Sequence, residues 1–197
     1  MINDIFEAID DNHIKSSIYA DDVAFLTTHR KVVTAIEQIQ LTLNKIEGLS
    51  IKWGLTLSPS KTKSIIFSKG IPSEEYNNLS ITNNLIQYVP HYKYIGVVLD
   101  KALNFNKHFE HIIQKSTRRI NIMKCIVGRK WGADRSTLTH LYISLIRPML
   151  DYNAFLYDNV ASKKIDSLQT IQNQALRIIT GCMRATNINA LHRGVDL

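Results

Sequence analysis

The sequence predicts an α+β fold in which a strand-containing first half precedes an all-helical second half. Up to about residue 100, short apolar runs alternate with turn-forming stretches around one long helical pattern. From Asn104 onward, apolar residues recur at helical spacing. Because the period changes, we expect a domain boundary near residues 89–104, with residues 1–100 in one domain and residues 101–197 in the other.

One long helix and several short strands are predicted in the first half. An amphipathic helix is expected over residues 32–53, with Gly54 as its end. Its apolar face holds Val32, Ile36, Ile39, Leu43, Ile46 and Leu49 or Ile51. A second helical pattern covers residues 2–9, and since no capping residue precedes it, it is typical of the end of a longer helix. Other apolar runs predict strands over residues 17–20, 23–26, 55–57, 64–67, 79–82, 85–89 and 94–99.

Three helices are predicted in the second half, over residues 105–127, 138–146 and 165–179. The second is interrupted by Pro148, and the third ends at Gly181.

The two cysteines and the ends of the chain bear on the cellular compartment. Cys125 and Cys182 lie on apolar helical stripes, so we expect buried free thiols and a reducing compartment. No apolar run approaches the roughly 20 residues that a membrane span needs. The acidic start lacks the basic region of a signal peptide. We therefore expect an intracellular protein without a membrane partner, and the sequence does not distinguish nucleus from cytoplasm.

Asp21 and Asp22 lie between two β-prone runs, which predicts a tight hairpin with an acidic turn. Two carboxylates side by side repel each other unless a counter-charge lies close to them. Divalent metal ions supply that charge, and pairs of ions about 3.5–4 Å apart support phosphoryl transfer. Mg²⁺ prefers carboxylates together with phosphates and water. The alternative is a solvated β-turn, where Asp is common because it forms local hydrogen bonds.

Several motifs, in order, resemble one enzyme family. Residues 18–24, Ile-Tyr-Ala-Asp-Asp-Val-Ala, resemble the YxDD signature of reverse transcriptases, with the alanine that members from non-LTR (LINE-like) retrotransposons favour. Residues 54–63 resemble the family's GLxxNxxKT motif, with Ser58 where the family often has Asn, and residues 92–100 resemble its YLGxxLD primer-grip hairpin. Residues 2–9 are similar to the segment after its PQG motif, and the helices after residue 104 resemble its thumb. The similarity covers essentially the whole chain, which is identified as a C-terminal fragment of such an enzyme.

This resemblance implies a partial polymerase palm, with antiparallel hairpins and a covering helix, followed by an all-helical thumb. It implies an RNA-directed DNA polymerase that adds deoxynucleotides to a primer 3′ end by two-metal catalysis, with Mg²⁺ or Mn²⁺ as cofactor. Asp21 would be the principal metal ligand and Asp22 the supporting one. Lys61 would lie near the phosphates of the incoming nucleotide as a proton donor to pyrophosphate, or it is an exposed turn lysine. The implied partners are an RNA template and a DNA primer, with deoxynucleoside triphosphates if a full palm is supplied.

Three further positions are assigned to the nucleic acid by resemblance. Tyr19 would lie beside the primer end or the template, or it is a tyrosine of the core. Tyr94 and Gly96 would lie in the primer-grip hairpin, where a glycine allows close approach of the backbone to a duplex end. The alternative for Gly96 is a strand glycine at a bulge.

The family needs a third metal-binding aspartate and a glycine-rich template motif, and neither occurs in the 197 residues. Asp4, Asp10 and Asp11 lie on or just after the opening helix, which by resemblance follows both motifs. We therefore expect little polymerase activity from this chain by itself, and an unpaired edge in its palm sheet. The alternatives are a non-catalytic nucleic-acid-binding remnant of a retroelement, or the product of a decayed reading frame without function.

Basic residues are concentrated in residues 101–135. Nine Lys or Arg and only two acidic residues occur there, an excess equal to the net charge of +7 of the whole chain. Such a concentration favours binding to a phosphate backbone over a merely solvated helical face. The basic residues are Lys101, Lys107, Lys115, Arg118, Arg119, Lys124, Arg129, Lys130 and Arg135.

Overall fold

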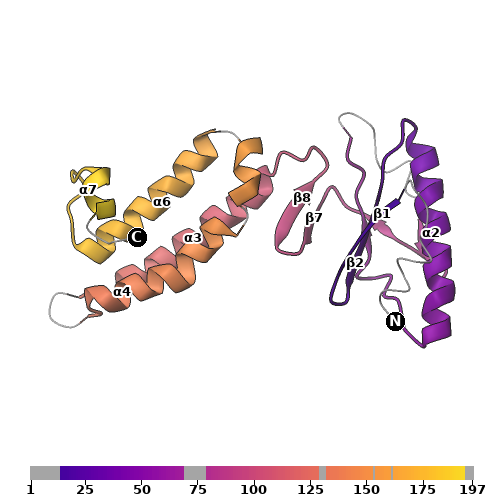
Figure 1. The fold of residues 1–197 in the computed structure, drawn as a ribbon, viewed down its shortest axis with the longest axis horizontal. Helices are drawn as coiled ribbons and strands as arrows, with labels where there is room; N and C mark the ends of the chain where they lie inside the picture. Colours follow the sequence, from indigo (N-terminus) through magenta and orange to yellow (C-terminus); the bar gives the residue numbers. More distant parts are fainter. Residues whose placement is uncertain (1–13, 69–78, 129–131, 153, 161, 194–197) are drawn as a thin grey trace. The chain divides into compact units, whose positions relative to one another are not determined.

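Helices and short pairs of strands form an α+β fold in the computed structural model, which describes residues 14–68, 79–128, 132–152, 154–160 and 162–193 (Figure 1). The chain divides into two compact units, Met1–Tyr92 and Lys93–Leu197. A functional boundary after residue 100 stays a prediction. The helix expected over residues 2–9 lies outside the described residues, as do Asp4, Asp10 and Asp11.

The predicted acidic hairpin is confirmed. Strands β1 (Ile14–Tyr19) and β2 (Asp22–Thr27) pair antiparallel, from Ile14 opposite Thr27 to Tyr19 opposite Asp22. Directly opposite residues lie on the same face of a sheet, and the faces alternate along each strand. One face of the hairpin therefore holds Ile14, Ile18 and Phe25. These side chains pack with Ile46 in the core of this unit.

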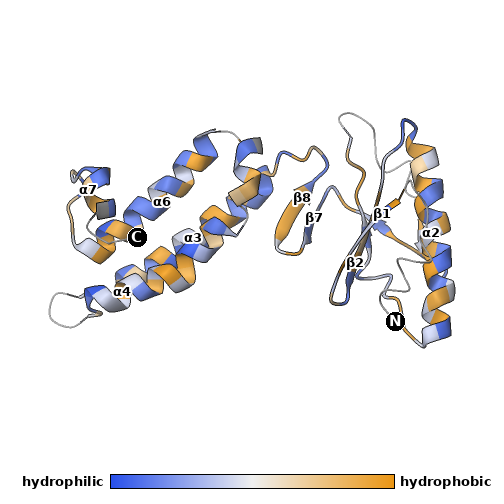
Figure 2. Ribbon diagram, viewed as in Figure 1, coloured by the Kyte–Doolittle hydropathy of each residue, from blue (hydrophilic) through white to orange (hydrophobic). Residues whose placement is uncertain are grey.

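Helix α2 (Val32–Trp53) has the bounds that its periodicity predicts. It packs against β2 and β4, and the stripe that it buries is centred on Leu43 and Ile46. Gly54 ends the helix with a φ of 64°, a conformation that glycine adopts without the penalty of a Cβ. Ile51 does not lie on the buried face, because its side chain is 75% exposed. Figure 2 shows hydrophobic and hydrophilic residues alternating along the helix, as amphipathic packing requires.

The remaining strands of this unit are shorter than predicted. The parallel pair is β3 (Lys63–Ser64) with β6 (Gln87–Tyr88), and the antiparallel pair is β4 (Ser80–Ile81) with β5 (Asn84–Leu85). The strand expected over residues 55–57 is wrong: the chain there is irregular, and no strand among the described residues pairs with it. An apolar run predicts burial, but it becomes a strand only where a second segment offers its backbone groups.

A second hairpin connects to the helices. Strand β7 (His91–Tyr94) pairs with β8 (Val97–Asp100) across a two-residue turn, Ile95–Gly96. The single strand expected over residues 94–99 is therefore wrong. Gly96 lies in a turn and not at a bulge.

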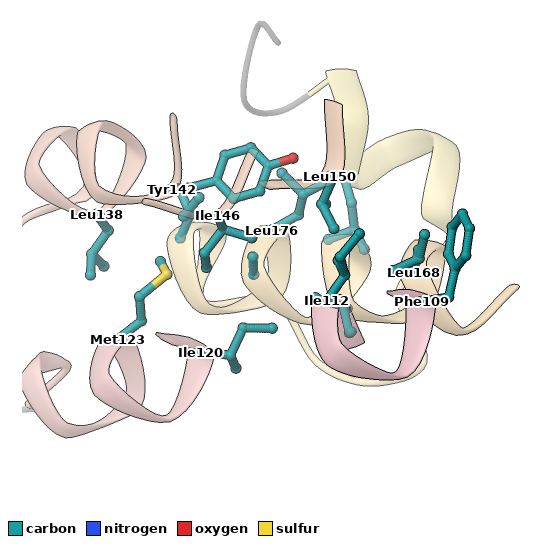
Figure 3. Packing of buried hydrophobic residues seen from close by; sticks show 14 of the residues in the cluster. Phe109, Ile112, Ile120, Met123, Leu138, Tyr142, Ile146, Leu150, Leu168 and Leu176 are labelled. Atoms are coloured by element: carbon teal, nitrogen blue, oxygen red, sulfur yellow. The ribbon is translucent and has the colours of Figure 1, made fainter. Parts of the chain in front are cut away.

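The second unit is built from helices around one apolar core. Its elements are α3 (Asn106–Ile126), α4 (Arg135–Leu141), a π-helical segment (Tyr142–Ile146), α5 (Arg147–Asp151), a 3₁₀ segment (Ala154–Asn159), α6 (Ser162–Thr180) and α7 (Ile188–Arg193). Figure 3 shows side chains of α3, including Ile112, Ile120 and Met123, directed toward Tyr142, Ile146 and Leu176. The long first and third helices are confirmed.

The helix predicted over residues 138–146 is irregular, but the irregularity lies before Pro148 and not at it. The π-helical segment intervenes, and Pro148 lies in the first turn of α5. A proline is tolerated there because the first N–H groups of a helix need no partner within it.

Both cysteines are free in the described part of the chain, and the predicted burial of their thiols is wrong. Cys125 and Cys182 are exposed. Cys125 lies two residues after Met123, about 200° around the helix and so on the side away from the buried stripe. Cys182 follows the end of α6. Among the described residues, no helix is long and apolar enough to cross a membrane.

Candidate active site and nucleic-acid interface

The acidic turn consists of Ala20 and Asp21, while Asp22 is the first residue of β2. Ala20 has a φ of 51°, in the left-handed region. A residue with a Cβ pays about 1–2 kcal/mol there, so the turn holds its apex under strain. As a result, the carboxylate of Asp21 lies at the tip of the hairpin and that of Asp22 lies one step into the strand.

Tyr19 and Asp22 lie on the hairpin face opposite α2. They form the last cross-strand pair, and the face that packs on α2 holds Ile14, Ile18 and Phe25. Both residues and Asp21 are exposed, and Tyr19 retains 65% of its surface. The alternative that Tyr19 belongs to the core is therefore wrong. This exposed face of the hairpin therefore holds the Asp22 carboxylate beside the Tyr19 phenol.

Neither carboxylate of the acidic turn has an ion pair or a hydrogen bond with another described residue. Two adjacent, exposed carboxylates without a cationic partner suit a divalent cation that prefers oxygen ligands. Six-coordinate ions need more ligands than these, and no group of three or more candidate metal-binding side chains occurs in the described residues. The described part of the chain thus presents two unpaired carboxylates at this hairpin and no complete metal site.

Lys61 lies in a turn with an ordered backbone. Its N–H donates to the Ser58 carbonyl at 3.2 Å, and Thr62 bonds the same carbonyl through its N–H at 3.1 Å and its hydroxyl at 2.9 Å. The Tyr92 hydroxyl donates to the Lys61 carbonyl at 3.4 Å. The Lys61 side chain is exposed. Within the described residues it makes no ion pair with the acidic turn.

Asp100, the last residue of β8, attaches the second hairpin to the helical unit. This carboxylate is buried and accepts hydrogen bonds from the N–H groups of Ala102 at 3.0 Å, Asn104 at 3.3 Å and Phe105 at 2.8 Å. Asp100 thereby fixes the loop that leads into α3, a role that we did not predict. An Asp between a strand and a helical pattern is the sequence signal for it.

His108 attaches the middle of β8 to α3. Its Nδ1 accepts a hydrogen bond from the Val98 N–H at 3.3 Å, and its ring is 1% exposed. Burial lowers the pKa of His108, and the nearby positive groups His111 and Lys93 lower it further. An acceptor at Nδ1 places the proton of the neutral ring on Nε2.

The predicted basic residues of α3 are distributed over more than one side of the helix. Lys107, Lys115 and Arg118 are exposed and, with His111, follow one stripe at spacings of four, four and three residues. We call Lys107, Lys115 and Arg118 the basic stripe. Lys124 is exposed too, but it lies nine residues from Lys115, which is two and a half helical turns and hence the opposite side.

Two other groups modify the charge around α3. The Arg119 guanidinium donates to the Leu145 carbonyl and is half-buried, so it joins α3 to the π-helical segment. Glu110 pairs with Lys164 of α6 at 2.8 Å, which neutralises the one acidic residue of the helix. Arg129 and Lys130 lie outside the described residues. Tyr94 is half-buried in β7.

The described residues thus form an α+β protein with an exposed pair of carboxylates at a hairpin and basic residues along helix α3. The chain is 26% identical over 163 residues to the RNA-directed DNA polymerase from mobile element jockey of Drosophila funebris, covering 83% of this chain and 18% of that protein. It is 24% identical over 173 residues to the Drosophila melanogaster jockey polymerase, covering 88% of this chain and 19% of the relative. Over 212 residues it is 21% identical to the Pol polyprotein from type-1 retrotransposable element R1 2 of Nasonia vitripennis, covering 91% of this chain and 50% of that protein.

These similarities confirm the resemblance that the motifs indicated: the homologues of this chain are RNA-directed DNA polymerases of non-LTR retrotransposons. The chain spans about a fifth of the length of the two jockey polymerases. No protein-family model and no solved structure matches the chain.

Proposed function

We propose that the 197 residues form part of a reverse transcriptase, with a partial palm in residues 1–100 and a thumb in residues 101–197. Homology to RNA-directed DNA polymerases supports this reading. The observation that carries it is the acidic hairpin, which presents Asp21 at its tip and Asp22 beside Tyr19 on the face away from α2.

In this proposal, Asp21 and Asp22 hold Mg²⁺ or Mn²⁺ at the hairpin tip. Bound divalent ions would stabilise the attacking and leaving oxygens of nucleotidyl transfer. Tyr19 provides an exposed aromatic surface for the primer end or the template, and Lys61 provides a positive charge and a proton for pyrophosphate. RNA template, DNA primer and deoxynucleoside triphosphates are the proposed partners.

The metal proposal is tested by titrating the chain with Mn²⁺, whose unpaired electrons broaden nearby NMR signals. We expect selective broadening of the Asp21 and Asp22 amides, and we expect Asp21→Asn to weaken it more than Asp22→Asn does. Asp166→Asn removes an exposed carboxylate of α6 and is the matched control. Equal broadening in all three variants would refute a metal site at the hairpin.

We further propose that the 197 residues by themselves do not extend a primer. Two carboxylates leave metal ions under-coordinated, and preorganised electrostatics supply most of the rate in phosphoryl transfer. The measurement is primer extension on an RNA template with Mg²⁺. Extension that disappears in Asp21→Asn would overturn this part of the proposal while leaving the assignment of the hairpin intact.

A non-catalytic nucleic-acid-binding protein is the second candidate, and the basic stripe is the observation that favours it. Contacts between such a stripe and phosphates are independent of sequence and weaken as salt rises. Removing three phosphate contacts lowers the slope of log affinity against log salt by about 2–3. We expect this change for Lys107, Lys115 and Arg118 replaced together by Ala, measured on an RNA/DNA duplex.

The control for that experiment replaces three exposed lysines elsewhere, Lys45, Lys52 and Lys163, by Ala, so that the net charge changes equally. An equal loss of affinity in both triple variants would show that total charge, and not the basic stripe, binds the duplex. Duplex binding without Mn²⁺ broadening at the hairpin favours the second candidate over the polymerase.

A further inference from the structure

The turn between β7 and β8 places both of its residues in the left-handed region. Ile95 has a φ of 41° and Gly96 a φ of 79°. Glycine adopts this conformation readily, but a β-branched residue rarely does. Because Ile95 opposes the conformation that the hairpin needs, the turn requires support from outside the hairpin to keep one geometry.

Tyr152, 57 residues later in the chain, supplies that support. Its hydroxyl donates to the Ile95 carbonyl at 3.1 Å. Its ring lies against Gly96, where an added Cβ would come within 3.0 Å of Cε1 and 3.6 Å of Cζ. A glycine lets the ring lie directly on the turn, whereas a Cβ at this position would push the ring away by a few tenths of an ångström.

Burial does not explain this arrangement. The side chain of Tyr152 is 58% exposed, at the C-terminal end of α5, and it contributes little to the apolar core of the helical unit. A buried tyrosine is held by its surroundings, whereas an exposed one is held by the specific contacts that it makes. Here these contacts are with the backbone of the turn.

We propose that Tyr152 is a positioning residue that holds the Ile95–Gly96 turn in place for contact with a primer 3′ end. The inference rests on the proposed function together with the resemblance of residues 92–100 to a primer-grip hairpin, by which this hairpin would approach the primer. Tyr152 fixes the turn, while His108 and Asp100 fix β8 at its middle and its end. With all three attachments, the hairpin keeps one position relative to α3 and α5.

The first arm of the test measures the hairpin itself. Tyr152→Phe removes the hydroxyl and keeps the ring, Tyr152→Ala removes both, and Tyr157→Phe removes a different hydroxyl, the one that donates to the Leu150 carbonyl. We expect amide hydrogen exchange at Val97 and Val98 to accelerate about fivefold in Tyr152→Phe, the effect of one lost hydrogen bond, and more in Tyr152→Ala. Exchange in the middle of α6 should stay unchanged. Unaltered exchange at Val97 and Val98 in both Tyr152 variants would overturn the proposal.

The second arm measures whether the position of the turn matters to a primer. The affinity of each variant for an RNA/DNA duplex with a recessed primer 3′ end is compared with its affinity for a blunt duplex of equal length. We expect the unaltered chain and Tyr157→Phe to prefer the recessed end, and Tyr152→Phe to lose about threefold of that preference. Affinity for the blunt duplex should not change.

The outcomes separate the two claims. If the unaltered chain shows no preference for the recessed end, the proposed contact of the hairpin with the primer fails, and the positioning role fails with it. If the preference exists and survives in Tyr152→Ala despite faster exchange, the hairpin contact stands and the role of Tyr152 is refuted.

Discussion

The two hairpins of this chain are built on similar turns but are supported in different ways. Each turn has two residues, and each contains a residue with a Cβ in the left-handed region, Ala20 in the first hairpin and Ile95 in the second. The second turn is held by Tyr152, and its strand β8 is held by His108 and Asp100. The first hairpin packs one face on α2 and leaves its acidic tip exposed.

An exposed tip and a firmly held turn suit different tasks. An exposed carboxylate pair remains available to a cation, at the cost of repulsion and strain in the turn. The second hairpin instead forms hydrogen bonds with neighbouring helices, and these hold its backbone in one place. The first hairpin is therefore suited to binding an ion and the second to positioning.

The largest effect is expected from truncating the core beneath the second hairpin. Phe109 is completely buried and contacts the rings of His108 and Tyr157. Phe109→Ala should lower the free energy of unfolding by about 3–5 kcal/mol, because it removes a large apolar side chain and leaves a cavity. Urea denaturation measures the loss. Hydrogen exchange at Val98 should rise with it, while exchange at Ala24 in the first hairpin should not.

Phe155, which is 70% exposed, provides the matched control for that variant. Phe155→Ala should change the free energy of unfolding by less than about 0.5 kcal/mol. A loss in Phe155→Ala as large as in Phe109→Ala would contradict the described core.

An intermediate effect is expected from protonating His108. Since burial lowers its pKa in the folded chain, the unfolded chain binds the proton more readily. Stability is therefore full above the ordinary pKa of histidine, about 6.5, and falls as the pH drops below that value toward the lowered pKa. Unfolding by urea at several pH values measures this, and exchange at Val98 should accelerate over the same range.

His108→Gln removes the titrating ring and keeps a hydrogen-bond acceptor, so its stability should vary less with pH. His140→Gln, an exposed histidine of α4, is the control and should behave as the unaltered chain does. If His108→Gln and the unaltered chain lose stability in parallel at acid pH, His108 is not responsible for the loss.

The smallest effect is expected at the acidic turn. Ala20→Gly removes the Cβ from a left-handed position and should stabilise the chain by up to about 1 kcal/mol, less the entropy that glycine gains in the unfolded state. Thermal unfolding measures it. Ala24→Gly in the middle of β2 is the control and should destabilise the chain, so stabilisation by both substitutions would contradict the strain at Ala20.

The helices were the most predictable part of the fold. Their apolar spacing gave α2 its bounds, and the glycines after α2 and α6 marked their ends. The acidic hairpin was predictable as well, because a two-residue turn and its flanking strands are contiguous. The short strands were not, since β3 pairs with β6 across more than twenty residues of sequence.

For the candidate site, the sequence pointed to Asp21 and Asp22 but could not tell that Asp22 and Tyr19 share the face of the hairpin away from α2. It marked a concentration of basic residues without showing that Lys124 lies opposite the basic stripe, or that Arg119 bonds the Leu145 carbonyl. It also placed both cysteines on buried apolar stripes, although Cys125 lies on the side of α3 away from the core, Cys182 lies after the end of α6, and both are exposed.

By itself, the sequence determined the long helices, the acidic turn and the homology to retrotransposon polymerases, because each of these depends on residues that are near one another in the chain or on motifs in a fixed order. Only the tertiary structure decided that Asp100 and His108 attach β8 to the helices, and that Tyr152 lies on Gly96. Those contacts join residues up to 57 positions apart. Their geometry depends on how helices and hairpin pack, and no local pattern of residue types records that packing.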